Sequence, residues 1–323
     1  MSQFQNPEAP NRVVAEVVRL WLVCPPGSGQ TLTRSATVLK PAPMLRRLLP
    51  ATVLVTLVAA TLPVFSADWR LVWSDEFDTP GLPDKAKWGY ETGFVRNNEL
   101  QFYTRDRREN ARAENGCLVI EGRKERYANP NYRPGGDPKK SRRTTVEFAD
   151  YTAASLITEG KASFLYGRVE VRAKLPQGKG VWPAIWMMGA NRAAVGWPRC
   201  GEIDIMEFVG KEPDRVHATV HFAQDGKHAS KGGKLATPAP SNDFHLYAVE
   251  WFPDRMDFFF DEQKYFTFPL DDAGTGPDNP FRKPCYLLIN LALGGSWGGP
   301  MDDAGLPQPY LIDYVRVYEA KKP

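Results

Sequence analysis

The residues best suited to chemistry lie in one short segment, GEIDIMEF, which runs from Gly201 to Phe208. It sets three carboxylates, Glu202, Asp204 and Glu207, among apolar residues whose types are typical of a strand with a buried face. Acids in such a strand are costly unless they have partners or a function. Two carboxyl groups about 5 to 5.5 Å apart can act as the nucleophile and the acid/base of a retaining glycosidase. The alternative is a strand edge whose acids only face water.

The phase of this strand decides whether the acids can act together. By strict alternation Glu202 and Asp204 share one face, and Glu207 falls on the other. One extra residue in a β-bulge would return Glu207 to the face of Glu202. The third acid could then orient the nucleophile and, as a close like charge, keep a neighbouring carboxyl protonated. The spacing therefore predicts a bulge if the segment is catalytic.

The elements around this segment read as strands. Short apolar and aromatic runs recur from Asp68 onward, and FLYGRVEVRAKL alternates apolar with charged residues. Few segments are long and periodic enough to be helices, so the pattern predicts antiparallel sheets in a sandwich or jelly roll. One all-β domain of this length is admissible, and we assign it to residues 67–323.

The N-terminal part is expected to lie outside this domain. Residues 44–66 begin with Met44, carry a basic pair and an apolar run, and end with a small-residue cleavage site at Ser66, which is the layout of a signal peptide. The run is short and interrupted by Pro50 and Pro63, which disfavours an uncleaved membrane anchor. Residues 1–43 are Pro-rich and are predicted to be a non-native upstream extension or disordered. We expect a secreted or periplasmic protein.

Charge and cysteine content restrict the possible partners. The net charge of +3, from 41 basic and 38 acidic residues, gives no reason to expect a nucleic acid or a membrane surface as partner. Beyond the leader, Cys117, Cys200 and Cys285 permit at most one intramolecular disulfide, and no pair has metal-ligand spacing. We expect a monomer whose partner is a polysaccharide.

Several motifs together resemble a known family. GEIDIMEF resembles the E-x-D-x-x-E signature of family-16 glycoside hydrolases, and NNELQFYT, VWPAIWMMG, FHLYAVEW, NLALGGSWGG and IDYVRVYE resemble successive landmarks of its laminarinase-like branch, which cleaves β-1,3-glucans. The resemblance extends over nearly the whole chain after the leader. It implies an all-β jelly roll of two curved antiparallel sheets with a substrate cleft on the concave face.

The resemblance also implies roles for individual residues. Glu202 would be the nucleophile, Glu207 the acid/base and Asp204 the residue that assists between them. Catalysis would need no cofactor. The expected substrate-binding residues are Trp182, Trp186, Asn98, His221, Trp197 and Trp297.

Two of these assignments have a structural alternative. Trp182 and Trp186 are four residues apart and share a face, where they could bind a sugar ring or fill the core. We expect them to be partly exposed in a cleft. His221 and His217 likewise share a face, and a metal site there lacks an apparent third ligand, so a structural histidine is the alternative.

Two further regions could bind ligands. The segment from Gly122 to Phe148 holds many arginines and lysines among prolines and glycines, and could be a solvated loop or the rim of a cleft for an extended or anionic substrate. The family resemblance suggests one structural calcium ion, with Glu76, the carbonyl of Gly116 and Asp313 in the matching positions.

The expected activity is therefore a retaining endo-β-1,3-glucanase. Rival activities are hydrolysis of a mixed-linkage glucan or of a red-algal galactan, because these enzymes share the acidic motif. A rival from another class is a non-catalytic glucan-binding protein, which would keep the aromatic cleft and lose the acids. The presence of all three acids argues against the last.

Overall fold

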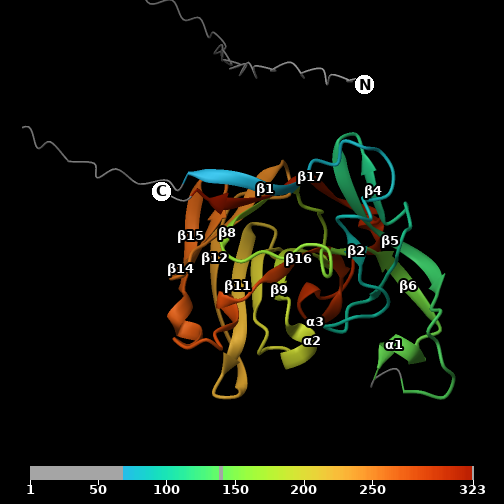
Figure 1. Ribbon diagram of the computed structural model, residues 1–323. Coiled ribbons are helices and arrows are strands. Elements are labelled where there is room, and N and C mark those ends of the chain that lie inside the picture. Colours follow the sequence, from blue (N-terminus) through green and yellow to red (C-terminus); the bar gives the residue numbers. More distant parts are fainter. Residues whose placement is uncertain (1–67, 138–140, 322–323) are drawn as a thin grey trace, which may run out of the picture. The chain divides into compact units, whose positions relative to one another are not determined.

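The computed structural model describes residues 68–137 and 141–321. The predicted upstream extension and signal peptide lie outside the described residues. Between Asp68 and Lys321 nearly all regular structure is β-strand, in two sheets (Figure 1). The all-β jelly-roll prediction is confirmed.

The first sheet has ten strands. Their order is β15 (Gln263–Pro269), β14 (Arg255–Phe260), β13 (His245–Trp251), β8 (Gly167–Lys174), β17 (Gln308–Ala320), β5 (Cys117–Ala128), β6 (Phe148–Ala153) and β3 (Gln101–Tyr103), with β1 (Trp69–Asp75) beside β17 and β4 (Ala111–Glu114) beside β5. These pairs are antiparallel except β3 with β6, which is parallel and which the sequence analysis did not foresee.

The second sheet has seven strands, all paired antiparallel. Their order is β12 (Lys227–Ala236), β11 (Arg215–Gln224), β10 (Glu202–Glu207), β9 (Val181–Gly189), β16 (Cys285–Leu293), β7 (Ser155–Ile157) and β2 (Gly89–Tyr90). Short helices lie in the connections: α1 (Arg142–Thr145), α2 (Arg192–Val195), α3 (Gly295–Gly298), η1 (Leu270–Ala273), η2 (Pro280–Arg282) and η3 (Asp303–Gly305).

The core fills the space between the two sheets. Val169 and Val171 of β8 enter it from the ten-stranded sheet, and Ile185 of β9 and Ile203 of β10 enter it from the seven-stranded sheet. Strands β9 and β16 are nevertheless buried along their whole length. Their residues that do not face this core must therefore be covered on the other face of the sheet, which is where the candidate site lies.

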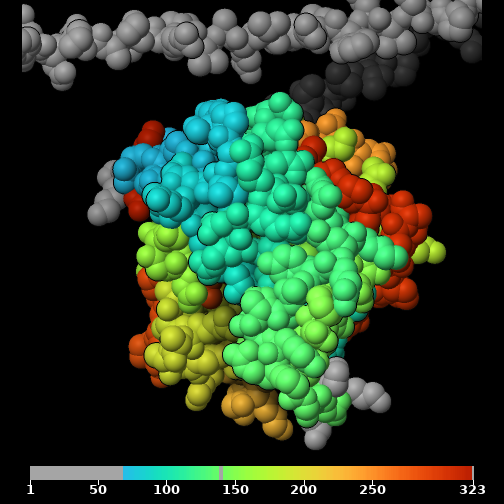
Figure 2. Space-filling model, turned by 90° about the vertical axis from the view of Figure 1, so that its right-hand side faces the viewer, coloured from blue at the N-terminus to red at the C-terminus, as the bar shows by residue number. Residues whose placement is uncertain are grey.

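Two arginines of the basic segment between β5 and β6 contact the chain that precedes β3. Arg142 lies over the ring of Phe94 at 4.6 Å, and Arg143 donates to the carbonyl of Val95 at 2.8 Å. The side of the molecule formed mainly by the N-terminal half of the described chain, coloured blue to green, is visible in Figure 2. These arginines thus hold the segment that precedes β3. Arg143 is still exposed, so the rim interpretation stays a prediction.

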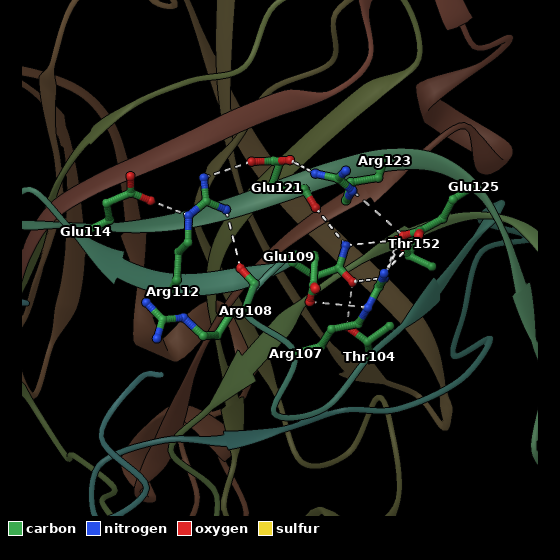
Figure 3. A network of polar contacts seen from close by, with 11 residues as sticks. Thr104, Arg107, Arg108, Glu109, Arg112, Glu114, Glu121, Arg123, Glu125 and Thr152 are labelled. Atoms are coloured by element: carbon green, nitrogen blue, oxygen red, sulfur yellow. Dashed lines mark hydrogen bonds and ion pairs between the residues drawn. The ribbon is translucent and has the colours of Figure 1, made fainter. Parts of the chain in front are cut away.

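Alternating charges connect β4, the loop that precedes it, and β5 on the ten-stranded sheet (Figure 3). Arg107 makes two hydrogen bonds to Glu125, at 2.6 and 2.8 Å, and Arg112 donates to Glu121 at 3.0 Å. Arg123 links the two acids, because it pairs with Glu121 and also lies 3.9 Å from Glu125. We call these five residues the arginine–glutamate network. Because each acid in it faces at least one arginine, the network joins the strands without leaving a carboxylate unpaired.

Candidate active site

Strand β10 contains the bulge that the spacing of its acids requires. Against β9, Asp204 lies opposite Trp186 and Met206 lies opposite Ile185, so β10 uses two residues where β9 uses one. The register with β11 shifts over the same interval. Ile205 and Met206 are both fully buried in the core between the sheets. The acids on either side of this pair consequently face the opposite side of the sheet together.

The three acids line one cavity of about 280 Å³. Its floor is built from alternate residues of the three central strands of the seven-stranded sheet, and loops close its sides. The lining residues are Arg96, Asn97, Glu99, Trp182, Ala184, Trp186, Met188, Arg192, Trp197, Glu202, Asp204, Glu207, Asn290 and Ala292. The cavity therefore combines an apolar aromatic floor with convergent polar groups, as carbohydrate and other small-ligand sites do.

Glu202 lies at one end of the row of acids. The indole Nε1–H of Trp197 donates to its Oε2 at 2.9 Å, and its Oε1 lies 3.9 Å from His221 Nε2. Burial raises the pKa of Glu202, while the charges of His221 and Arg96 and the hydrogen bond from Trp197 oppose this. Of the three acids, Glu202 thus has the most groups that stabilise its charged form.

Asp204 is the most deeply buried acid, with 4% of its surface exposed. Burial first, and then the negative charge of Glu202, hold its pKa well above the usual range. His221 Nε2 lies 3.1 Å from its Oδ2. The two atoms are not aligned for a hydrogen bond, and this oxygen has no hydrogen-bond partner within the described chain.

Glu207 lies at the other end of the row. The indole Nε1–H of Trp182 donates to its Oε1 at 3.1 Å. Burial and then the charge of Asp204 hold the pKa of Glu207 well above the usual range, and the Trp182 hydrogen bond offsets only part of this. A carboxyl group in such surroundings keeps its proton at higher pH than an exposed one, which suits a general acid.

Trp182 and Trp186 lie on one face and line the cavity, but the expectation of partly exposed rings is wrong. They are 8% and 6% exposed because each packs into a small apolar cluster on the cavity side of the sheet. Trp186 donates to Asn290 at 2.7 Å and lies under the guanidinium of Arg96, 4.8 Å from the ring centre. Both tryptophans hold polar residues of the cavity in place.

Of the predicted tryptophans, Trp197 has the open ring. It is 45% exposed, lines the cavity and contacts Glu202 directly. Trp297 packs edge-on against Trp182, with ring centres 5.5 Å apart, and is not among the lining residues. Asn98 is exposed and does not line the cavity either, whereas its neighbour Asn97 does.

The two histidines of β11 lie beside the two ends of the acid row. His221 is opposite Glu202 and His217 is opposite Glu207 in the β10–β11 register. His217 lies 3.5 Å from Glu212, and burial lowers its pKa. The described residues do not bring His217 and His221 into one metal-binding group. His221 instead lies with Glu202 and Asp204 of β10, and the three possible ligand atoms are within 4.8 Å of one another.

Sequence reasoning missed several residues of the cavity. Arg96 and Glu99 come from the loop before β3, Arg192 from α2 and Asn290 from the middle of β16. Glu99 is buried, accepts a hydrogen bond from Gln101 at 2.7 Å, and has a pKa raised by burial. The one detectable signal was Asn290, a single amide inside the apolar run CYLLINLAL.

The residues expected to bind calcium do not fit an ion in this arrangement. Both carboxylate oxygens of Glu76 accept hydrogen bonds from Arg316, at 3.1 and 2.8 Å. Asp313 accepts one from Arg172 at 2.5 Å. A calcium ion would need these oxygens as ligands, so both arginines would have to move away first.

The chain is similar to known proteins of one family. Residues 124–316 match the family described as "Glycosyl hydrolases family 16". A beta-glucanase of Rhodothermus marinus is 45% identical over 265 residues, which cover 77% of this chain and 85% of that protein. The X-ray structure of the laminarinase from Rhodothermus marinus matches with a TM-score of 0.68 and 43% identity, over 79% of this chain and 99% of that one.

A second solved structure has a higher TM-score, 0.73, at 40% identity, and covers 81% of this chain and 93% of that one. Its title describes endo-acting O-glycanases that initiate mucin breakdown, from members of the human gut microbiota. The chain therefore belongs to glycoside hydrolase family 16.

Proposed function

We propose that this glycoside hydrolase is a retaining endo-β-1,3-glucanase that acts on laminarin-type glucans. The observation that carries the proposal is the bulge in β10, which sets Glu202, Asp204 and Glu207 on one cavity face. The names of its relatives support the substrate class, since they include a laminarinase and a glucan endo-1,3-beta-glucosidase of Cryptopygus antarcticus that is 38% identical.

In the first step, a carboxylate oxygen of Glu202 attacks the anomeric carbon and forms a glycosyl-enzyme bond. Glu207 gives its proton to the glycosidic oxygen, so that the leaving sugar departs as a neutral alcohol. The raised pKa of Glu207 supports this role, because the group holds its proton until the bond breaks. Trp197 and His221 help Glu202 to stay charged as the nucleophile.

In the second step, Glu207 is a carboxylate and takes a proton from an incoming water molecule. The water oxygen attacks the anomeric carbon, the bond to Glu202 breaks, and the sugar keeps its original β configuration. Asp204 lies between the two acids in the strand, and burial and then the negative charge of Glu202 raise its pKa. The reaction uses only carboxyl groups and water, so it needs no catalytic cofactor.

The residues proposed to contact the substrate differ in how far their side chains are exposed. Trp197 supplies the exposed ring on which the apolar face of a sugar can stack. Trp182 and Trp186 contribute edges of nearly buried rings, together with the polar groups that they hold. His221 acts through the acids of β10. For Asn98 and Trp297, contact with an extended substrate stays a prediction.

A second substrate class has a specific observation in its favour. Arg96 and Arg192 line the cavity and could pair with an anionic sugar. A relative that is 36% identical is named keratan-sulfate endo-1,4-beta-galactosidase. We rank this class second, because Arg96 already pairs with Glu91. A mixed-linkage glucan is the remaining alternative.

One experiment separates these substrates and tests the mechanism. Reducing-sugar release should be measured side by side on laminarin, lichenan, agarose, carrageenan and keratan sulfate, with proton NMR of the first product. We expect the highest rate on laminarin and an initial β-anomer. A sulfated polymer as best substrate would reverse the ranking, and an initial α-anomer would exclude the retaining mechanism.

Export of the protein and its domain boundaries stay predictions. No helix within residues 68–137 or 141–321 is long and apolar enough to cross a bilayer. We propose that residues 67–323 form the catalytic domain and that cleavage near Ser66 releases it. N-terminal sequencing of the exported protein tests this, and a mature chain that begins before residue 44 would contradict it.

A further inference from the structure

The geometry around His221 points to an inhibitory zinc site, and we propose that Zn²⁺ binds to His221, Asp204 and Glu202. His221 Nε2 lies 3.1 Å from Asp204 Oδ2 and 3.9 Å from Glu202 Oε1. The three ligand atoms all lie within 4.8 Å of one another. Tetrahedral zinc with bonds of about 2.0 to 2.2 Å sets its ligands about 3.3 to 3.6 Å apart. Small side-chain rotations therefore suffice to close the site.

An independent observation concerns the unused oxygens. Asp204 is 4% exposed, and its Oδ2 has no hydrogen-bond partner within the described chain although His221 Nε2 is close. A buried carboxylate oxygen without a partner is costly, and a cation would satisfy it. On Glu202, Trp197 binds Oε2 and leaves Oε1 on the side of His221. Both acids thus have one oxygen available to an ion.

His228 of β12 holds the imidazole of His221 in the orientation that a ligand needs. His221 Nδ1 and His228 Nε2 are 2.8 Å apart, and the ring centres are 5.1 Å apart with an interplanar angle of 20°. Each nitrogen lies one ring radius from the centre of its own ring. The distance between the two ring centres equals the nitrogen–nitrogen distance plus about two such radii, which is possible only if both nitrogens lie on the line that joins the centres. The hydrogen bond is therefore linear and nearly in the plane of both rings.

This hydrogen bond selects the nitrogen that can bind metal. When Nδ1–H of His221 donates to His228, the lone pair on Nε2 of His221 faces Asp204 and Glu202. Metal-binding histidines commonly donate their second ring N–H to an acceptor, which fixes the ring and strengthens the ligand. His228 is exposed and rests against Trp197, with ring centres 4.7 Å apart. It would be a supporting residue and not a ligand.

The donor set favours zinc over a harder cation. One imidazole and two carboxylates with an open fourth position match zinc sites, whereas calcium takes six to eight oxygens. Arg96 and Arg192 also line the cavity, and their charges oppose the ion. Bound zinc would engage Glu202 and Asp204, so it would block hydrolysis. Only the inhibition rests on the proposed function, and the binding does not.

Calorimetric titration of the metal-free protein with ZnCl₂, without substrate, tests the binding. We expect one zinc ion per chain. His228→Ala should weaken binding by about 10- to 100-fold, as loss of a supporting partner does. His245→Ala is the matched control, because His245 also pairs with an acid, Asp261, at 2.9 Å, but lies on the other sheet. It should bind zinc as the wild type does.

Two results would overturn the site. The first is a wild type that binds no zinc, and the second is undiminished binding by both His221→Ala and Asp204→Asn variants that circular dichroism shows to be folded. Zinc inhibition of laminarin hydrolysis, measured separately, should weaken in parallel with binding in His228→Ala. An active enzyme that ignores zinc would contradict this inference alone. Zinc binding by a protein inactive on every glucan would contradict only the proposed function.

Discussion

Two groups of acids in this protein have the same chemistry and opposite surroundings. In the arginine–glutamate network, Glu125 is paired with Arg107, and that hydrogen bond is the main reason why its pKa is lowered. In the cavity, Glu207 has an indole as its hydrogen-bond donor, and burial holds its pKa well above the usual range. An arginine partner makes an acid structural, whereas burial without one leaves an acid whose proton can be used.

The difference has a cost in stability. Paired acids such as Glu125 favour the folded state at neutral pH, because folding stabilises their charged form. Acids whose pKa is raised in the folded state oppose folding once the pH is high enough to charge them in the unfolded chain. Stability is commonly lost in this way at sites that need perturbed groups. Substituting one acid at a time in each group tests whether its surroundings set its role.

The largest effect should come from the acids of the cavity. Glu202→Gln should lower kcat on laminarin by at least about 10⁴-fold, because it removes the proposed nucleophile. Glu207→Ala should lose about 10²- to 10⁴-fold, and added azide should restore turnover of an activated aryl glycoside as a β-glycosyl azide. Steady-state kinetics and product NMR measure both.

The matched control for these variants is Glu125→Gln, the same chemical change in the network. It should retain nearly wild-type kcat. If the rescued product of Glu207→Ala were the α-anomer, the roles of Glu202 and Glu207 would have to be exchanged. Equal losses without rescue in either cavity variant would leave the assignment of roles without support.

The next effect concerns the bulge. Deleting Met206 leaves GEIDIEF, in which the acids follow at regular two-residue steps on one face. We expect a folded protein with retaining activity, reduced by about 100-fold because the surrounding groups are fitted to the bulged strand. An alanine inserted after Met206 should reduce activity further. A folded but inactive deletion variant beside an active insertion variant would refute the grouping of the acids.

A smaller effect should appear in thermal stability, with opposite signs in the two regions. At pH 7, Glu125→Gln should lose about 1 to 2 kcal/mol and lower Tm by a few degrees, because a charged hydrogen bond is weakened. Glu207→Gln should raise Tm, because the raised pKa of Glu207 favours the unfolded state at this pH, whereas glutamine does not titrate and keeps an acceptor for Trp182. Differential scanning calorimetry measures both.

The pH dependence of these shifts follows from the direction of each pKa. The contribution of Glu125 is present above the unfolded pKa of about 4.3 and is lost as the pH falls through the lowered folded value. The penalty from Glu207 grows as the pH rises from about 4.3 through its raised folded value. Below pH 4 the Glu207→Gln variant should therefore melt with the wild type. A Tm of Glu207→Gln below that of the wild type at pH 7 would contradict this account.

The smallest effect should come from Trp197→Phe, which removes an N–H donor and keeps an aromatic ring. The pKa of Glu202 should rise, because the lost hydrogen bond favoured its charged form. The acidic limb of the kcat/KM profile should move to higher pH by less than about 1 unit. Tm should change little, because the ring is 45% exposed. An unmoved acidic limb would mean that another group controls it.

The sequence predicted those features that depend on local periodicity. The all-β fold followed from short alternating runs. The bulge followed from the spacing of Asp204 and Glu207, which is one residue longer than strict alternation on one face allows. The burial of Trp182 and Trp186 could not be predicted, because clusters from other strands cover them. The arginines of the Gly122–Phe148 segment were ambiguous for the same reason, since their partners lie elsewhere in the chain.

Residues that enter the cavity from separate strands were also missed. Arg96, Glu99 and Asn290 come together only through the pairing of distant segments. His228 lies in KHASKGGKLA, an exposed glycine-containing strand with no apolar alternation, so nothing in its own segment links it to His221. Local patterns thus identified the strand that carries the acids but not the groups that set their protonation.

Ile205 and Met206 are adjacent in the chain and both place their side chains in the core between the sheets. The positions of the acids on the cavity face therefore depend on how these two side chains pack in the core. A core substitution such as Ile205→Val changes how tightly the extra residue is seated, although it touches no substrate. Catalytic rate can therefore drift or be tuned through packing alone. A search for faster variants that samples only the residues around the cavity would overlook this control.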